Sequence, residues 1–172
     1  MIKSFIWSSV FLLFFVIFET AILSNIQALP VMPDLALLAL LYISFRNGSF
    51  AGETSGFVSG LLLDFLSAAP LGLNSFIRTC AGFITGLFSG SFNMDAVFLP
   101  AFMGFAATLF KALMTWVLSF FFGSAIMVYS ITSSAFWIEV ILNTVLTPVI
   151  FALLSLFSSL LLVKEGGGNA SD

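Results

Sequence analysis

The chain has 172 residues, of which 60% are hydrophobic and 8% are charged, with a net charge of -3 and no histidine. Soluble domains carry roughly 25% charged residues, so this composition cannot cover a water-facing surface and predicts a protein of the lipid bilayer. The lack of histidine and the single cysteine, Cys80, argue against a His-based catalytic triad, a zinc site and a disulfide. The few scattered Lys and Arg residues argue against nucleic-acid binding. We therefore expect neither an enzyme nor a cofactor.

Six apolar runs separated by turn signals predict six membrane-spanning helices. The first follows Lys3 and contains Glu19. The second begins at Pro30, Pro33 and Asp34, because proline suits the first turn of a helix and aspartate accepts its free N–H groups. This helix has only about 12 residues, so we expect it to be tilted or part of a broken helix. The predicted helices cover about residues 4–24, 34–46, 50–66, 73–91, 97–122 and 135–163.

These spans predict one transmembrane domain over residues 1–163 and a flexible tail over residues 164–172. With six spans, both termini lie on the same side of the membrane. Lys3, Arg46 and Lys164 all fall on that side, and the opposite loops contain no Lys or Arg. The positive-inside rule therefore predicts cytoplasmic termini. All loops are short, so any function must lie in the helices or at their edges.

Two glycine series with a spacing of four residues point to close helix packing. Residues four apart share a helix face, and small residues on one face let another backbone approach closely. The two series run antiparallel around the Pro70-Leu71-Gly72 turn and each carries one charged residue. They consist of Gly48, Gly52, Gly56, Gly60 and Asp64 in one helix, and of Arg78, Gly82, Gly86 and Gly90 in the next.

Asp64 and Arg78 lie seven residues either side of Leu71, at the same depth in a simple hairpin. We expect them to form an ion pair near the outer membrane edge, because an intramembrane charge costs about 2.5–3.5 kcal/mol. In the alternative, each side chain reaches the headgroups separately. Lys111 lies near mid-membrane and is a candidate functional charge; it could meet a carboxylate, face a ligand cavity or contact a partner. The rotation of Glu19 and Glu139 is too uncertain to make them a catalytic pair.

Several motifs in the middle of the chain occur together and in a fixed order. They are Pro30-x-x-Pro33-Asp34, Arg46-Asn47-Gly48-Ser49, Gly52-x-x-x-Gly56-Phe57-x-x-Gly60-Leu61-Leu62-Leu63-Asp64, Pro70-Leu71-Gly72-Leu73-Asn74 and Gly82-x-x-x-Gly86. With these motifs the chain resembles the MreD family, small integral membrane proteins of the bacterial rod-shape system. The resemblance assigns no role to Cys80 or Lys111.

The resemblance implies a non-enzymatic scaffold of the cell-elongation complex in the bacterial cytoplasmic (inner) membrane. Such a protein binds an MreC-like protein and helps couple MreB filaments to peptidoglycan synthesis by RodA and a class B penicillin-binding protein. It also implies a six-helix transmembrane bundle similar to the substrate-capture components of energy-coupling-factor transporters. The glycine faces could pack on each other or receive a partner helix; if they are used internally, partner contact moves to the first or last helix.

The alternative function is a small-molecule, vitamin-like binding subunit of a membrane transporter. A binder needs an outward pocket with convergent polar groups. Five side chains could line such a pocket: Asp64, Asn74, Arg78, Glu139 and Asn143. The short loops, which have little polar or aromatic content to close a pocket, favour the scaffold.

Overall fold

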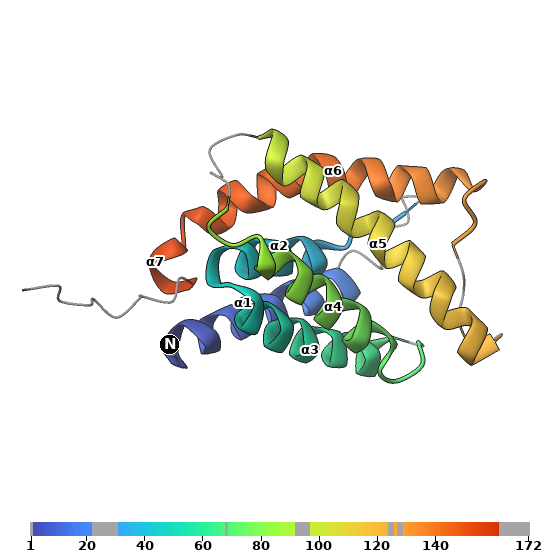
Figure 1. The fold of residues 1–172 in the computed structure, drawn as a ribbon, viewed down its shortest axis with the longest axis horizontal. Helices are drawn as coiled ribbons and strands as arrows, with labels where there is room; N and C mark the ends of the chain where they lie inside the picture. Colours follow the sequence, from blue (N-terminus) through green and yellow to red (C-terminus); the bar gives the residue numbers. More distant parts are fainter. Residues whose placement is uncertain are drawn as a thin grey trace, which may run out of the picture.

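A computed structural model shows an all-helical chain (Figure 1). The structure describes residues 2–21, 31–67, 69–91, 97–123, 126 and 129–161, so Pro30 and the predicted tail lie outside the described residues. Seven helices occur in this part of the chain: α1 (Ile2–Ala21), α2 (Leu35–Asn47), α3 (Ser49–Leu66), α4 (Leu73–Leu87), α5 (Phe98–Phe122), α6 (Ser134–Ser155) and α7 (Ser158–Leu161).

Two of the predicted helices end earlier than expected. The fourth helix stops at Leu87 rather than residue 91, and Gly90 then has a φ of 74°, which a right-handed helix cannot contain. The predicted helix over residues 135–163 ends at Ser155, where a turn at residues 156 and 157 separates α6 from the short α7.

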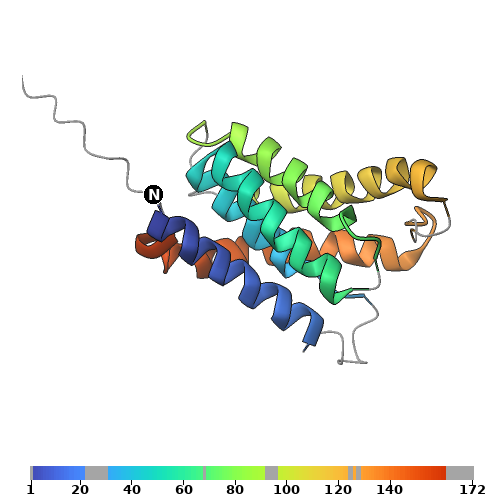
Figure 2. The same ribbon diagram turned by 90° about the horizontal axis from the view of Figure 1, so that it is seen from below.

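Helix α2 lies in the centre of the molecule. Helices α1, α3 and α4 pack on one side of it, and α5 and α6 contact it from the other (Figures 1 and 2). All its residues from Leu35 to Phe45 are buried. Since Leu and Ala surround the helix on every face, it can only be stable when fully enclosed by other apolar surfaces.

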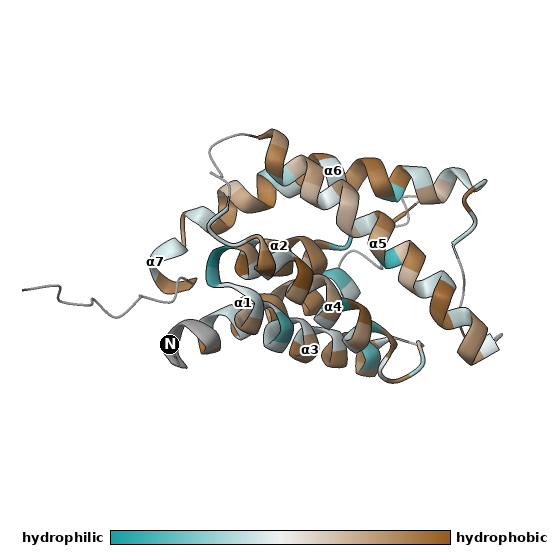
Figure 3. Cartoon of the chain, viewed as in Figure 1, coloured by the Kyte–Doolittle hydropathy of each residue, from teal (hydrophilic) through white to brown (hydrophobic). Residues whose placement is uncertain are grey.

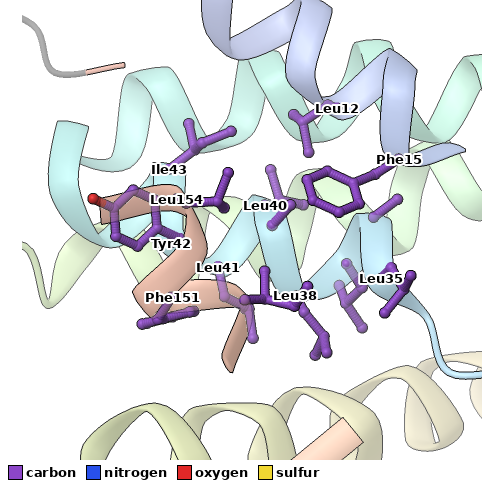
Figure 4. Packing of buried hydrophobic residues seen from close by; sticks show 14 of the residues in the cluster. Leu12, Phe15, Leu35, Leu38, Leu40, Leu41, Tyr42, Ile43, Phe151 and Leu154 are labelled. Carbon is purple, nitrogen blue, oxygen red and sulfur yellow. The ribbon is translucent and has the colours of Figure 1, made fainter. Parts of the chain in front are cut away.

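The main apolar core forms around α2 (Figure 4). Leu12 and Phe15 of α1 belong to this core with Leu40 of α2. Two residues further along α2, Tyr42 meets the ring of Phe151 from α6 edge to face, with 5.3 Å between the ring centroids. The core therefore holds the first and the last long helix against the same central helix.

Helices α3 and α4 pack backbone to backbone. A Cβ atom added to Gly52 or Gly82 would overlap the main chain of the other residue, and one on Gly56 would strike the carbonyl of Arg78. Further along the pair, Gly60 faces the main chain of Ser75 in the same way. The glycines thus leave no room for any side chain between the two helices.

The glycine series extends beyond this contact at its ends. Gly86 meets the main chain of Ser49, but a Cβ on Gly48 or Gly90 would meet nothing within 4 Å. Gly48, between α2 and α3, has a φ of 87°, and Gly90 also has a positive φ. These two glycines therefore lie in turns, where other L residues are strained. The main chain of Gly48 still lies against Gly86, whereas Gly90 has no comparable contact.

Many large apolar side chains are exposed on the helices. Hydrophobic residues occur along every long helix in Figure 3. In the described part of the chain, two helices are long and apolar enough to cross a membrane, Phe98–Phe122 and Ser134–Ser155. Two further apolar helices are shorter, Ile6–Ala21 and Leu35–Asn47. These features are consistent with the expected helical membrane protein.

The close contact of α3 and α4 predicts a strong effect of Gly56→Leu. The added side chain would fall on the main chain of α4, and overpacking of this kind typically costs about 1–3 kcal/mol. Phe57→Leu provides a matched control, because Phe57 is exposed on the next position of α3. We expect thermal unfolding in mild detergent to show a lower midpoint for G56L alone. Equal midpoints for the two variants would contradict the packing described here.

Candidate functional site

Asp34 is placed at the start of α2 by the sequence of the helix itself. It is the N-cap residue, and its Oδ1 accepts a hydrogen bond of 2.9 Å from the N–H of Leu37. The Asp34 N–H donates to Oδ1 of Asn143 in α6 at 3.0 Å. Pro33 and Asp34 are both buried, so this helix start lies inside the protein and not at its surface.

Two cations from different helices bind the Asp34 carboxylate. Nη2 of Arg78 in α4 lies 2.6 Å from Oδ1, and Nζ of Lys111 in α5 lies 2.8 Å from Oδ2. Arg78 and Asp34 are 2% and 3% exposed, so this pair is withdrawn from solvent. Hydrogen-bonded geometry of this kind compensates for burying the charges, and removing one partner leaves the other uncompensated.

The network continues from Lys111 to α6. Lys111 also donates to Oε1 of Glu139 at 3.1 Å, and the hydroxyl of Tyr129 donates to the same oxygen at 3.3 Å. Asn143, one turn after Glu139, donates to Thr108 at 3.0 Å. Polar contacts therefore join α2 to α4, α5 and α6 through one buried site.

The expected Asp64–Arg78 ion pair is wrong, because Arg78 pairs with Asp34. Asp64 instead accepts the N–H groups at the start of α4, those of Gly72, Asn74 and Ser75, at 2.9–3.1 Å. The side chains of Asn74 and Ser75 donate to it as well. The first N–H groups of a helix have no partner within the helix, so this nearby carboxylate satisfies them.

The motif residues Pro33, Pro70 and Gly72 shape the two helix starts. The N–H of Leu35 bonds to the Pro33 carbonyl and the N–H of Leu73 to the Pro70 carbonyl, each at 3.1 Å. Gly72 has a φ of 94°, in the left-handed region that favours glycine. This turn directs the first N–H groups of α4 toward Asp64.

The five residues of the predicted ligand pocket fall into two groups. Asp64 and Asn74 lie together at the start of α4, whereas Arg78, Glu139 and Asn143 belong to the network around Asp34. Lys111 meets carboxylates, the first of the three possibilities raised for it. Within the described residues, no three His, Cys, Asp or Glu side chains are arranged to hold a metal ion.

Sequence reasoning identified Asp34 as a helix cap but missed it as the ionic partner of Arg78 and Lys111. One signal was available, the unusual shortness of the second helix. Thirteen residues of α helix extend about 20 Å, less than the ~30 Å apolar thickness of a bilayer. One end of such a helix falls within the membrane depth, where the other intramembrane charges need a counterion.

An apolar groove of about 530 Å³ opens between α4 and α5, next to this network. The two helices contact each other far less closely than α3 and α4 do. Buried Phe45 of α2 lines the groove, and the other lining residues recur at spacings of three and four along both helices. They include Ala81, Thr85 and Phe88 of α4 and Phe102, Ala106 and Phe110 of α5.

The family model for the rod shape-determining protein MreD matches residues 1–157. The site and fold described above therefore belong to a membrane protein of rod-shape determination, and the chain is a member of the MreD family. This family consists of shape-determining proteins and is not a known enzyme family. Comparison with curated proteins and with solved structures found no match.

The ion-pair assignment predicts different coupling for two pairs of residues. In a double-mutant cycle, Asp34→Asn and Arg78→Gln should show a coupling energy of about 0.5–3 kcal/mol, because the two side chains share a buried contact. The cycle of Asp64→Asn with Arg78→Gln is the control and should be nearly additive. Unfolding of the purified protein in detergent supplies both values. Stronger coupling in the Asp64 cycle would restore the pair expected from the hairpin.

Proposed function

We propose that this protein is a non-enzymatic, multi-pass scaffold of the cell-elongation complex in the bacterial inner membrane. In this role it binds the transmembrane helix of an MreC-like protein. It thereby helps couple MreB filaments to peptidoglycan synthesis by RodA and a class B penicillin-binding protein. Membership of the MreD family supports the role in rod shape, and the partner contacts are the proposal.

The proposed topology has α1 to α6 as one bundle of membrane-associated helices with both termini in the cytoplasm. Arg46 is exposed at the end of α2, as expected at a cytoplasmic membrane edge. The proposed bundle is similar to the substrate-capture components of energy-coupling-factor transporters. On this topology the groove between α4 and α5 opens toward the cytoplasmic half of the bilayer.

The observation that carries the proposal is the open groove beside a fully used glycine interface. The glycine faces of α3 and α4, with Gly52, Gly56 and Gly82, are covered by the contact between these two helices, so a partner cannot bind there. The groove instead offers small side chains, Ala81 and Ala106 among them, between large aromatic ones. Small residues let a partner helix approach closely in a membrane. We place the contact here and not on the first or last helix, because two helices together form this concave surface.

The network around Asp34 weighs against the vitamin-binding alternative. In transporters with discontinuous helices, a helix N-terminus inside the membrane points at an anionic group of the substrate. Here the N–H groups at the start of α2 bond to the carboxyl groups of Asp34 and Glu19. The chain's own carboxyl groups therefore occupy the position that an anionic ligand would take, which favours a scaffold.

A bulky residue in the groove tests the proposal. Ala106→Trp would fill the groove, whereas Leu113→Trp places the same side chain on an exposed position of α5. Each tagged variant is purified from its native membrane in mild detergent, and mass spectrometry quantifies the co-purified proteins and small molecules. We expect A106W to reduce recovery of the MreC-like protein at least tenfold relative to L113W.

Two outcomes contradict the proposed binding surface, and a third contradicts the proposed function. Equal recovery of the MreC-like protein with both variants would exclude the groove as its binding surface. A co-purified lipid displaced by A106W, with no change in the partner, would assign the groove to an acyl chain. A stoichiometric vitamin or an ATPase module in the purified sample would instead support the transporter alternative.

A further inference from the structure

We propose that Glu19 of α1 is a proton-binding site, whose carboxyl group is neutral in the folded protein. The inference does not depend on the proposed partner. It rests on the position of Glu19 at the start of α2 and on the charges gathered there. The ligand of this site is a single proton.

Glu19 and Asp34 both accept hydrogen bonds from N–H groups at the start of α2. Oε2 of Glu19 accepts a hydrogen bond of 3.3 Å from the N–H of Ala36, while Asp34 accepts from the N–H of Leu37. Glu19 therefore joins α1 to the same helix start that Asp34 caps. Two ionised carboxylates at one buried helix end repel each other, and this repulsion disfavours the charged form of one of them.

The charges around this helix end do not balance. Asp34, Glu139 and Glu19 bring three carboxyl groups, while Arg78 and Lys111 bring two cations. Among the described residues, Glu19 is the member of this set with no cation within 4 Å. An unbalanced charge inside a membrane protein is costly, and binding a proton removes it.

Neither of the other carboxylates is a comparable place for the proton. Both oxygens of Asp34 accept from cations, so protonating it would weaken its contacts with Arg78 and Lys111. Glu139 accepts from both Lys111 and the Tyr129 hydroxyl. Within the described residues, Glu19 accepts only the backbone N–H of Ala36, so it loses no ion pair there when it becomes neutral.

The position of Arg78 supports a neutral Glu19. Nη1 of Arg78 is buried and has no hydrogen-bond partner. An ionised Glu19 would gain free energy by moving to this donor, yet the two side chains form no ion pair. Of the elements packed against α1, α3 carries Glu53 in its first half and Asp64 near its end, and Asp64 is already bound by the start of α4. The described part of α7 carries no charge.

The proposal has a consequence for stability. If Glu19 binds a proton only in the folded protein, the folded state holds one more proton than the unfolded state near neutral pH. Stability then decreases as pH rises and this proton is lost, since high pH favours the state with fewer bound protons. The contact between α1 and the start of α2 should weaken first.

Infrared spectroscopy of the purified full-length protein in lipid nanodiscs tests the proposal. A neutral carboxylic acid gives a carbonyl band that is separate from those of carboxylates. We expect this band in the wild type at neutral pH, its loss in Glu19→Gln and its retention in the control Glu53→Gln, which removes a carboxyl group of α3 that takes no part in the ion pairs around Asp34. Wild-type thermal stability should also fall as pH is raised, and E19Q should show a smaller fall.

Two results would overturn the proposal. If the wild type shows no protonated-acid band at neutral pH, Glu19 is ionised, whether or not the variants fold. If the band persists in E19Q or disappears in E53Q, the proton is on another group.

Discussion

The contact of Asp34 with two cations is the constraint on which the arrangement of helices depends. One carboxylate at the start of α2 binds Arg78 of α4 and Lys111 of α5, and its backbone N–H reaches Asn143 of α6. A charge in this position is stable only while these partners surround it. The rotation of α4 follows from the same residue: the side chain of Arg78 turns to α2, while its carbonyl lies against Gly56 of α3. The ionic contact and the glycine contact therefore fix one helix together.

Much of the helical framework could be predicted from the sequence, because it depends on local patterns. Apolar runs between turn signals located the first five helices to within a few residues, and the four-residue glycine spacing predicted two antiparallel helices around Pro70 and Gly72. The leucine-rich sequence after Asp34 also predicted a short helix. The prediction failed at two glycines, because spacing alone does not reveal the backbone conformation of a residue. Gly48 and Gly90 share the spacing of the series, but their positive φ values assign them to turns.

The ion pairs could not be predicted for a different reason. Because Asp64 and Arg78 would lie at equal depth in a hairpin, the sequence suggested that they form a pair. That prediction did not consider the N–H groups at the start of α4, which have no partner within the helix. These N–H groups and two side chains donate to both oxygens of Asp64. The true partner of Arg78 comes from α2, 44 residues earlier in the chain. Contacts between such distant helices depend on helix rotation and crossing, which periodicity does not determine. The groove between α4 and α5 depends on the same long-range geometry.

The network and the groove are physically connected, and this connection bears on the proposed scaffold role. Phe110, which lines the groove, immediately precedes Lys111 on α5, and Ala81 lies one turn beyond Arg78 on α4. Asp34 holds both cations, so it limits how far α4 and α5 can separate at this end of the groove. A partner helix would thus enter a space whose width is set by a rigid ionic contact. Because that space exists before binding, less ordering is needed when the partner binds, which favours a stable complex.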